Sequence, residues 1–249
     1  MLGVLALLER RRHGPPSRAA WRHAAAAGAL LAADLILWHH AIADVGAGLS
    51  TVLANLQVVL VALAAWLLLG ERPSGRVAAA VPLVFAGAVL ISGVLGDDAF
   101  GANPTRGAVF GVLTAVAYTG FILVLREAGR DLRRPAGPLF AATLVATVVA
   151  TIAGALLGEV DLVPSWPAHG WLVTLALTSQ VLGWLLITIA LPRLPASLTS
   201  IVLTVQPVAS VVLGIVLLGE DPAPLQLAGV GVVVAGIVVA TRRRPAAVA

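Results

Sequence analysis

The chain has 249 residues, of which 59% are hydrophobic and 11% are charged, and its formal net charge is +4. A soluble domain must cover its core with polar residues, and this chain has too few of them. The composition therefore excludes a soluble globular protein and indicates a membrane protein. An excess of basic residues is typical of proteins that bind nucleic acid. Here, however, the arginines are spread over alternate loops, which argues against nucleic acid as a partner. No cysteine is present, which excludes disulfides and thiol chemistry.

The first eight residues are apolar, but eight helical residues cover only about 12 Å and cannot cross a membrane alone. They are typical of the end of a helix rather than a signal peptide, because Glu9 and Arg10 follow the apolar run. Eight hydrophobic stretches of spanning length come next, each near the ~20 residues that cross a bilayer. We expect these spans at residues 21–43, 47–69, 77–96, 106–125, 138–157, 168–191, 196–218 and 224–241.

Every basic residue of the chain except the histidines is arginine, and all of these arginines but Arg106 lie in alternate loops or in the tail. The positive-inside rule places those loops in the cytoplasm, and with them the C-terminal tail, residues 242–249. The opposite loops are acidic. The sequence therefore predicts a multi-pass protein of the cell membrane with a cytoplasmic C-terminus.

One segment of the chain occurs twice. Leu68-Leu69-Gly70-Glu71 recurs 149 positions later as Leu217-Leu218-Gly219-Glu220, and Gln57 then pairs with Gln206. The first copy lies on the Arg-bearing side and the second on the opposite side, so the two units are predicted to be inverted. We expect an all-α polytopic membrane protein with repeats at 1–96 and 106–241. The glycines should end their helices, and Glu71 and Glu220 should lie at the membrane interface in an architectural role.

The same offset pairs Met1 with Ala150, inside the fifth predicted span, although the second unit begins near Arg106. The first unit is therefore expected to lack about 44 residues at its front. Those residues would form helix 1 and most of helix 2 of a ten-helix molecule, which leaves about eight full helices and a partial one. A misassigned start codon and a shortened gene remain alternative explanations.

The run 33–40, Ala-Asp-Leu-Ile-Leu-Trp-His-His, resembles the EamA-type branch of the drug/metabolite transporter superfamily. So do Gly70-Glu71-Arg72-Pro73, Gln206-Pro207 and Gly219-Glu220. The resemblance covers the whole chain and implies two inverted five-helix repeats, export of small metabolites, amino acids or drugs, and a cell-membrane location. The family commonly has proline where this sequence has Val58. No motif identifies a substrate, and we expect no cofactor and no metal.

Asp34 is the only acid within a predicted span, where an ionised carboxylate costs roughly 2.5 to 3.5 kcal/mol. It shares a helical stripe with Trp38. Two interpretations stay open: a site that takes up a proton or a cationic substrate group, or a carboxylate hydrogen-bonded between helices. His39 and His40 are further candidates for proton coupling, although packing near the outer interface is the favoured alternative for both.

Further polar residues are candidates for substrate binding. Gln57 and Gln206 are repeat equivalents that would line a cavity between the units, whereas Asn55 faces away from Gln57 and would hold helices together. Thr114 with Tyr118, and Gln180 with Trp184, are four apart on one helical face and would form aromatic and polar walls. Aromatic residues in spans are also often interfacial anchors, which remains the alternative.

The leading hypothesis is a secondary transporter that exports small organic solutes by alternating access, with proton coupling left open. No nucleotide-binding motif supports ATP as the energy source. A shortened, non-transporting remnant is one alternative. An intramembrane enzyme using Asp34 with His39 or His40 is another, disfavoured because no second acid lies in a span. A homodimer is left open, because small-residue helices could pack within one chain or between two.

Overall fold

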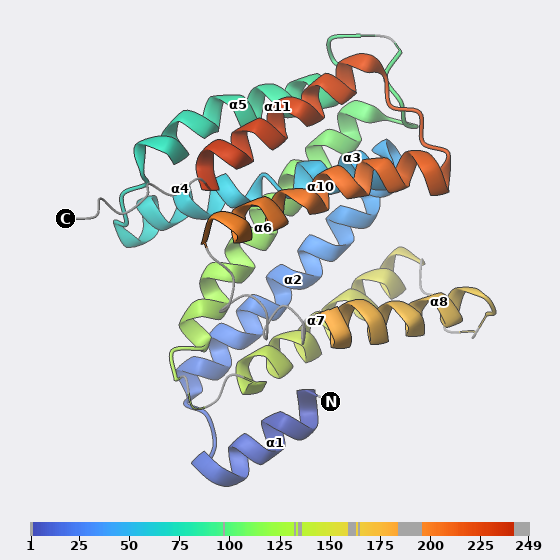
Figure 1. The fold of residues 1–249 in the computed structure, drawn as a ribbon. Helices are drawn as coiled ribbons and strands as arrows, with labels where there is room; N and C mark the ends of the chain where they lie inside the picture. Colours follow the sequence, from blue (N-terminus) through green and yellow to red (C-terminus); the bar gives the residue numbers. More distant parts are fainter. Residues whose placement is uncertain are drawn as a thin grey trace.

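The computed structural model describes residues 2–96, 98–131, 133, 136–158, 163, 165–183 and 196–241. All regular secondary structure in these residues is helical (Figure 1). The elements are α1 Leu2–His13, α2 Arg18–Val45, α3 Ala47–Ala54, α4 Gln57–Leu69, α5 Gly75–Ile91, α6 Pro104–Ala128, α7 Ala136–Leu157, α8 Ala168–Leu175, the π-helical η1 Ala176–Gly183, α10 Ala196–Leu218 and α11 Pro224–Thr241.

The predicted hydrophobic spans fall on helices, except that the helix of the third ends at Ile91 and residues 92–96 are not helical; the end of the sixth span, beyond Gly183, lies outside the described residues. Within the described part of the chain, five stretches are long and apolar enough to cross a membrane: α2, α3 with most of α4, α6, α7 and α11. α5 and the Val205–Leu218 part of α10 are shorter apolar helices. The prediction of an all-α polytopic membrane protein is confirmed.

The ends of several helices follow from local sequence. Ser17 and Asn103 cap α2 and α6 by accepting hydrogen bonds from backbone N–H groups three residues later. Gly70 and Gly219 follow α4 and α10 with φ of 72° and 68°, a left-handed conformation that glycine adopts without strain. Their predicted role as helix terminators is confirmed.

The predicted span 47–69 is interrupted in its middle, between α3 and α4. The N–H groups of Leu56, Val58 and Val59 bond to carbonyls three residues earlier instead of four, so the chain tightens into a 3₁₀ turn. The Asn55 amide donates to the Thr51 carbonyl at 2.8 Å, within its own helical turn, and it does not bridge helices as expected. Gln57 is the first residue after this turn.

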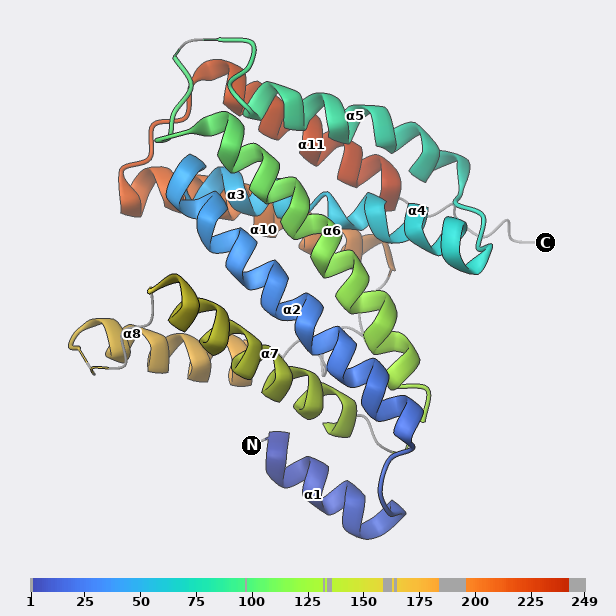
Figure 2. The ribbon, with the colours of Figure 1, turned by 180° about the vertical axis from the view of Figure 1, so that it is seen from behind.

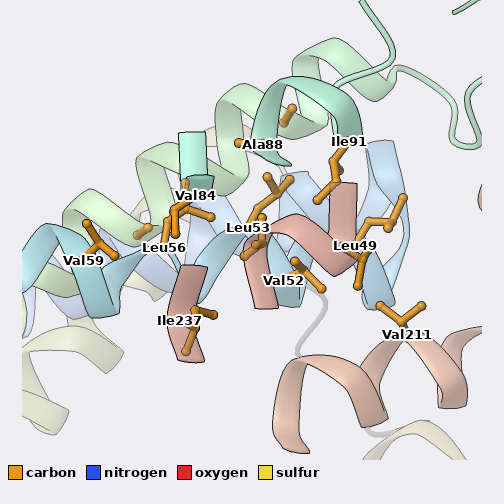
Figure 3. Close-up of a cluster of buried hydrophobic side chains, with 14 of the residues drawn as sticks. Leu49, Val52, Leu53, Leu56, Val59, Val84, Ala88, Ile91, Val211 and Ile237 are labelled. Carbon is orange, nitrogen blue, oxygen red and sulfur yellow. The ribbon is translucent and has the colours of Figure 1, made fainter. Parts of the chain in front are cut away.

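The main hydrophobic core lies where α3 and α4 meet α5, α6, α10 and α11 (Figure 3). Leu49, Leu53 and Leu56 are fully buried at its centre. The helices approach closely because small residues face large ones: a Cβ added at Gly111 of α6 would lie 2.7 Å from the Cβ of Leu53. Figure 2 shows α2 and α6 side by side along their length, with α7 and then α1 packed on the far side of α2.

α5 and α11 pack against each other in both views, and their contacts are reciprocal (Figures 1 and 2). A Cβ added at Gly87 would lie 2.6 Å from Val233 Cγ2, and one added at Gly236 would lie 2.6 Å from Val84 Cγ2. Each glycine and each valine differs from its counterpart by 149 positions. The residue nearer the start of α5 contacts the residue nearer the end of α11, and the reverse, so the two helices are antiparallel. A two-fold relation between inverted units produces this pattern.

Candidate functional site

Asp34 lies in the middle of α2 and is only 7% exposed. In the described part of the chain its carboxylate has neither a hydrogen-bond donor nor a basic partner. The expectation of a carboxylate hydrogen-bonded between helices therefore finds no support in these residues. A buried, unpaired acid is unfavourable until a proton or a cationic group reaches it.

The packing of α2 on α6 shows which residues lie opposite Asp34. The rings of His40 and Phe110 are 5.2 Å apart, and a Cβ added at Gly120 would lie 3.2 Å from a terminal carbon of Leu30. The two helices are therefore antiparallel, and Asp34, six residues before His40, lies level with residue 116. That level is between Thr114 and Tyr118, and the Tyr118 hydroxyl lies close enough to Asp34 to interact electrostatically.

Two further polar atoms at this depth are buried without partners. Within the described residues, Thr114 Oγ1 and Gln57 Oε1 are the buried side-chain oxygen or nitrogen atoms that lack a hydrogen bond. Leu53 packs on Gly111 of α6, and Gln57 and Thr114 lie near the middle of the apolar stretches Ala47–Leu68 and Pro104–Ala128. Leaving such groups unpaired costs about 1–3 kcal/mol each.

We call Asp34, Gln57, Thr114 and Tyr118 the central polar cluster. It combines residues of α2, α4 and α6 at one depth, and its unpaired atoms are all oxygens. The Asp34 carboxylate and the Gln57 Oε1 accept hydrogen bonds, and the Thr114 hydroxyl can accept or donate one, so the cluster suits a ligand that donates hydrogen bonds or carries positive charge. A proton can also satisfy the carboxylate, as in the proton relays of membrane transporters.

Three neighbouring candidates make contacts typical of packing. Trp38 is half-buried and meets the His39 ring edge-on, with centroids 5.9 Å apart. His39 is exposed, and its Nδ1 lies 2.8 Å from the Leu35 carbonyl of its own helix. His40 stacks on Phe110. Packing was the favoured alternative for both histidines, and their role in proton coupling stays a prediction.

Of the remaining candidates, one is exposed and the others lie outside the described residues. Gln206 is exposed in α10, so in this conformation it does not meet Gln57 inside a closed cavity. The Gln180 side chain and Trp184 lie outside the described residues. Their roles in substrate binding stay predictions.

A hollow of about 550 Å³ lies elsewhere, at the Arg-bearing ends of α1, α2 and α6. Glu9, Arg10, His23 and Arg130 are among its lining residues, and none of the central polar cluster is. Charged side chains near the Arg-bearing loops are typical of the membrane–water interface.

Glu220 makes specific contacts that the sequence did not predict. This side chain is 7% exposed, and its carboxylate accepts hydrogen bonds from the backbone N–H groups of Ala47 and Gly48, at 2.5 and 3.0 Å. Burial is possible because these donors at the start of α3 replace water. The recurrence of Glu in both repeats was the available signal, but a contact across 173 positions is not visible in local sequence.

Other polar residues at this end of the helices are also fully paired. Arg106 donates from Nε and a terminal nitrogen to the Asp44 carboxylate, at 2.7 and 2.5 Å. Gln226 is 1% exposed and bonds to backbone atoms of Ile91, Phe100 and Ala223. We call this region the Arg-poor end, because Arg106 is the one arginine in its loops. The lone arginine among acidic loops is the sequence signal that indicates this pairing.

A sequence model described as the EamA-like transporter family matches residues 1–93 and 105–242. An uncharacterized protein of Pseudomonas aeruginosa is 33% identical over 226 residues, which cover 90% of this chain and 73% of that protein. No solved structure matches the chain.

Proposed function

The chain belongs to the EamA-like transporter family, and from that premise we propose that it exports small organic solutes by alternating access through the central polar cluster. Membership makes the protein a multi-pass membrane transporter of the drug/metabolite type and not an enzyme. The substrate class, the direction and the location in the cell membrane are our proposals.

The observation that carries the proposal is the set of unpaired oxygens at one depth. Gln57 and Thr114 each have a buried oxygen without a protein partner in the described residues, and Asp34 is 7% exposed with no hydrogen-bond donor or basic partner there. A folded protein rarely leaves such groups unpaired, and where it does a ligand, ion or water commonly completes them. Substrate sites of inverted-repeat carriers lie near the bilayer midplane, which is where this cluster lies along α2 and α6.

Two features support movement of the units about this cluster. The reciprocal contacts of α5 and α11 are those of inverted repeats, and the ranges 1–93 and 105–242 follow the proposed division at 96 and 106. The 3₁₀ turn before Gln57 places a hinge-like element beside the cluster. The arginine-rich loops lie in the cytoplasm in this proposal, together with the C-terminal tail.

Asp34 is the proposed coupling residue. Its carboxylate binds either a proton or a cationic group of the solute, and exchange of one for the other would drive export. Because a neutral amide can hold neither, Asp34→Asn should abolish the dependence of transport on the pH gradient.

The test compares solutes in the medium of cells that express the wild type, Asp34→Asn or no transporter, by mass spectrometry. We expect the wild type to release at least one small organic solute that the empty cells retain, and Asp34→Asn to lose that release. Asp221→Asn, an exposed acid outside the cluster, is the matched control. Release by Asp34→Asn at the wild-type rate and pH dependence would remove Asp34 from coupling.

A further inference from the structure

The N-terminus of α3 is capped by the other half of the molecule. Gly46 separates α2 from α3, and no side chain of its own segment caps the new helix. Glu220 supplies the cap, because each oxygen of its carboxylate accepts a hydrogen bond from a backbone N–H, one from Ala47 and one from Gly48. A carboxylate at this position also faces the positive end of the helix dipole.

Glycines on both sides make room for this carboxylate. A Cβ added at Gly46, Gly48 or Gly214 would lie 2.8, 2.9 or 2.3 Å from an atom of the Glu220 carboxyl group. Gly214 belongs to α10, and the Glu220 N–H bonds back to its carbonyl at 3.1 Å. The cap therefore joins α3 and the end of α10, with Gly48 on one side of the carboxylate and Gly214 on the other.

The repeat relates this cap to a second one that is not made. Glu220 is the counterpart of Glu71, and Ala47 is the counterpart of Ala196, where α10 begins. In the described conformation the Glu71 side chain is 51% exposed and pairs with Arg126 at 3.2 Å. The two equivalent glutamates therefore differ in burial and in partner: Glu220 is buried against a helix N-terminus, whereas Glu71 is exposed and paired with an arginine.

We propose that Glu220 is a latch that holds the Arg-poor end of the transport path shut, and that Glu71 takes the equivalent cap on α10 when the opposite end shuts. This inference rests on the proposed function, since only alternating access requires one end to open while the other closes. Release of Glu220 frees α3 from α10, and the 3₁₀ turn at residues 55–56 lets α3 move relative to α4.

The chain has no native cysteine, so one introduced cysteine reports accessibility without background. Gln57→Cys places it at the depth of the central polar cluster. A membrane-impermeant maleimide is applied to one face of sealed vesicles of known orientation, and labelling is compared with Glu220 intact, with Glu220→Gln and with Asp221→Asn. Asp221 is the neighbouring exposed acid and is the matched control.

With Glu220 intact, labelling should come from the Arg-rich face. Glu220→Gln should raise the rate from the Arg-poor face about tenfold and lower it from the other face, because the neutral amide loses a charge-assisted hydrogen bond. Asp221→Asn should change neither rate. Adding Glu71→Gln to Glu220→Gln should return labelling toward the Arg-rich face.

Unchanged labelling in Glu220→Gln would overturn the latch. Equal gains from both faces would also overturn it, because a merely structural cap loosens the fold without direction. Since the readout is accessibility, it is independent of solute export. A directional shift in a protein that releases no solute would contradict the proposed function and leave the latch standing.

Discussion

The Arg-poor end and the central polar cluster differ in whether their buried polar side chains have hydrogen-bond partners. At the Arg-poor end, Asp44, Glu220 and Gln226 are as buried as Asp34, and every one has its partners. In the central polar cluster, the buried side chains of Asp34 and Thr114 and the buried Oε1 of half-buried Gln57 have no hydrogen-bond partner within the described residues. Burial alone therefore does not identify a binding site; buried polar atoms without partners do.

Gln226→Ala should have the largest effect on stability. The amide uses both of its lone pairs and both of its N–H groups, so its loss leaves up to four backbone groups unpaired. We expect destabilisation of about 3 kcal/mol, seen as a lower melting temperature by circular dichroism in detergent. Asp221→Ala, an exposed neighbour, should change the melting temperature little. Equal melting temperatures for both variants would contradict the role given to the Arg-poor end.

Arg106→Ala should cost less, about 1–2 kcal/mol. It leaves the Asp44 carboxylate, 4% exposed, without its partner, but the 61% exposure of Arg106 screens the pair. Replacing both residues, Asp44→Asn with Arg106→Ala, should recover part of the loss in the same melting experiment, because no charge is then buried alone. A double variant less stable than Arg106→Ala would show that the pair does not act as a buried carboxylate and its partner.

Thr114→Val should separate the two regions most clearly. It removes an unpaired buried hydroxyl and keeps the side-chain volume, so stability should stay equal or rise by up to about 1 kcal/mol. Solute release should fall about fivefold, because the solute loses a hydrogen-bond partner of about 1 kcal/mol. Release is measured in the same medium assay. A large loss of stability would show that the hydroxyl has a protein partner.

Arg126→Ala should have the smallest effect. Its ion pair with Glu71 joins two exposed side chains, and such pairs contribute about 0–1 kcal/mol. The melting temperature should shift by little and should not become more sensitive to salt. A shift as large as that of Gln226→Ala would mean that the Arg-rich end is held as firmly as the Arg-poor end.

Much of the helical architecture could be predicted because hydrophobic length dictates it. The spans followed from about twenty apolar residues each, and Gly70 and Gly219 marked the ends of α4 and α10. The interruption at Asn55 was missed, because the apolar pattern of 47–69 continues through it and only backbone hydrogen bonds reveal the turn.

The site was predictable in its residue types and not in their pairing. Asp34 is conspicuous in sequence as the one acid in a span, yet whether it has a partner depends on how α2 packs on α6. Glu220 is the opposite case: it has partners that the sequence does not reveal, because the donors at Ala47 and Gly48 lie about 170 positions away. A sequence repeat identifies equivalent positions, but tertiary packing determines which of two equivalent side chains is buried.

Protection of a cysteine at the central polar cluster by a transported solute tests the central claim most directly. Gln57→Cys would be labelled with a permeant maleimide, with and without the solute that the release assay identifies. If the cluster binds the solute, labelling slows as the solute concentration rises, and Asp34→Asn removes this protection. Labelling at the same rate at every solute concentration, in a protein that still exports the solute, would contradict the assignment of the site.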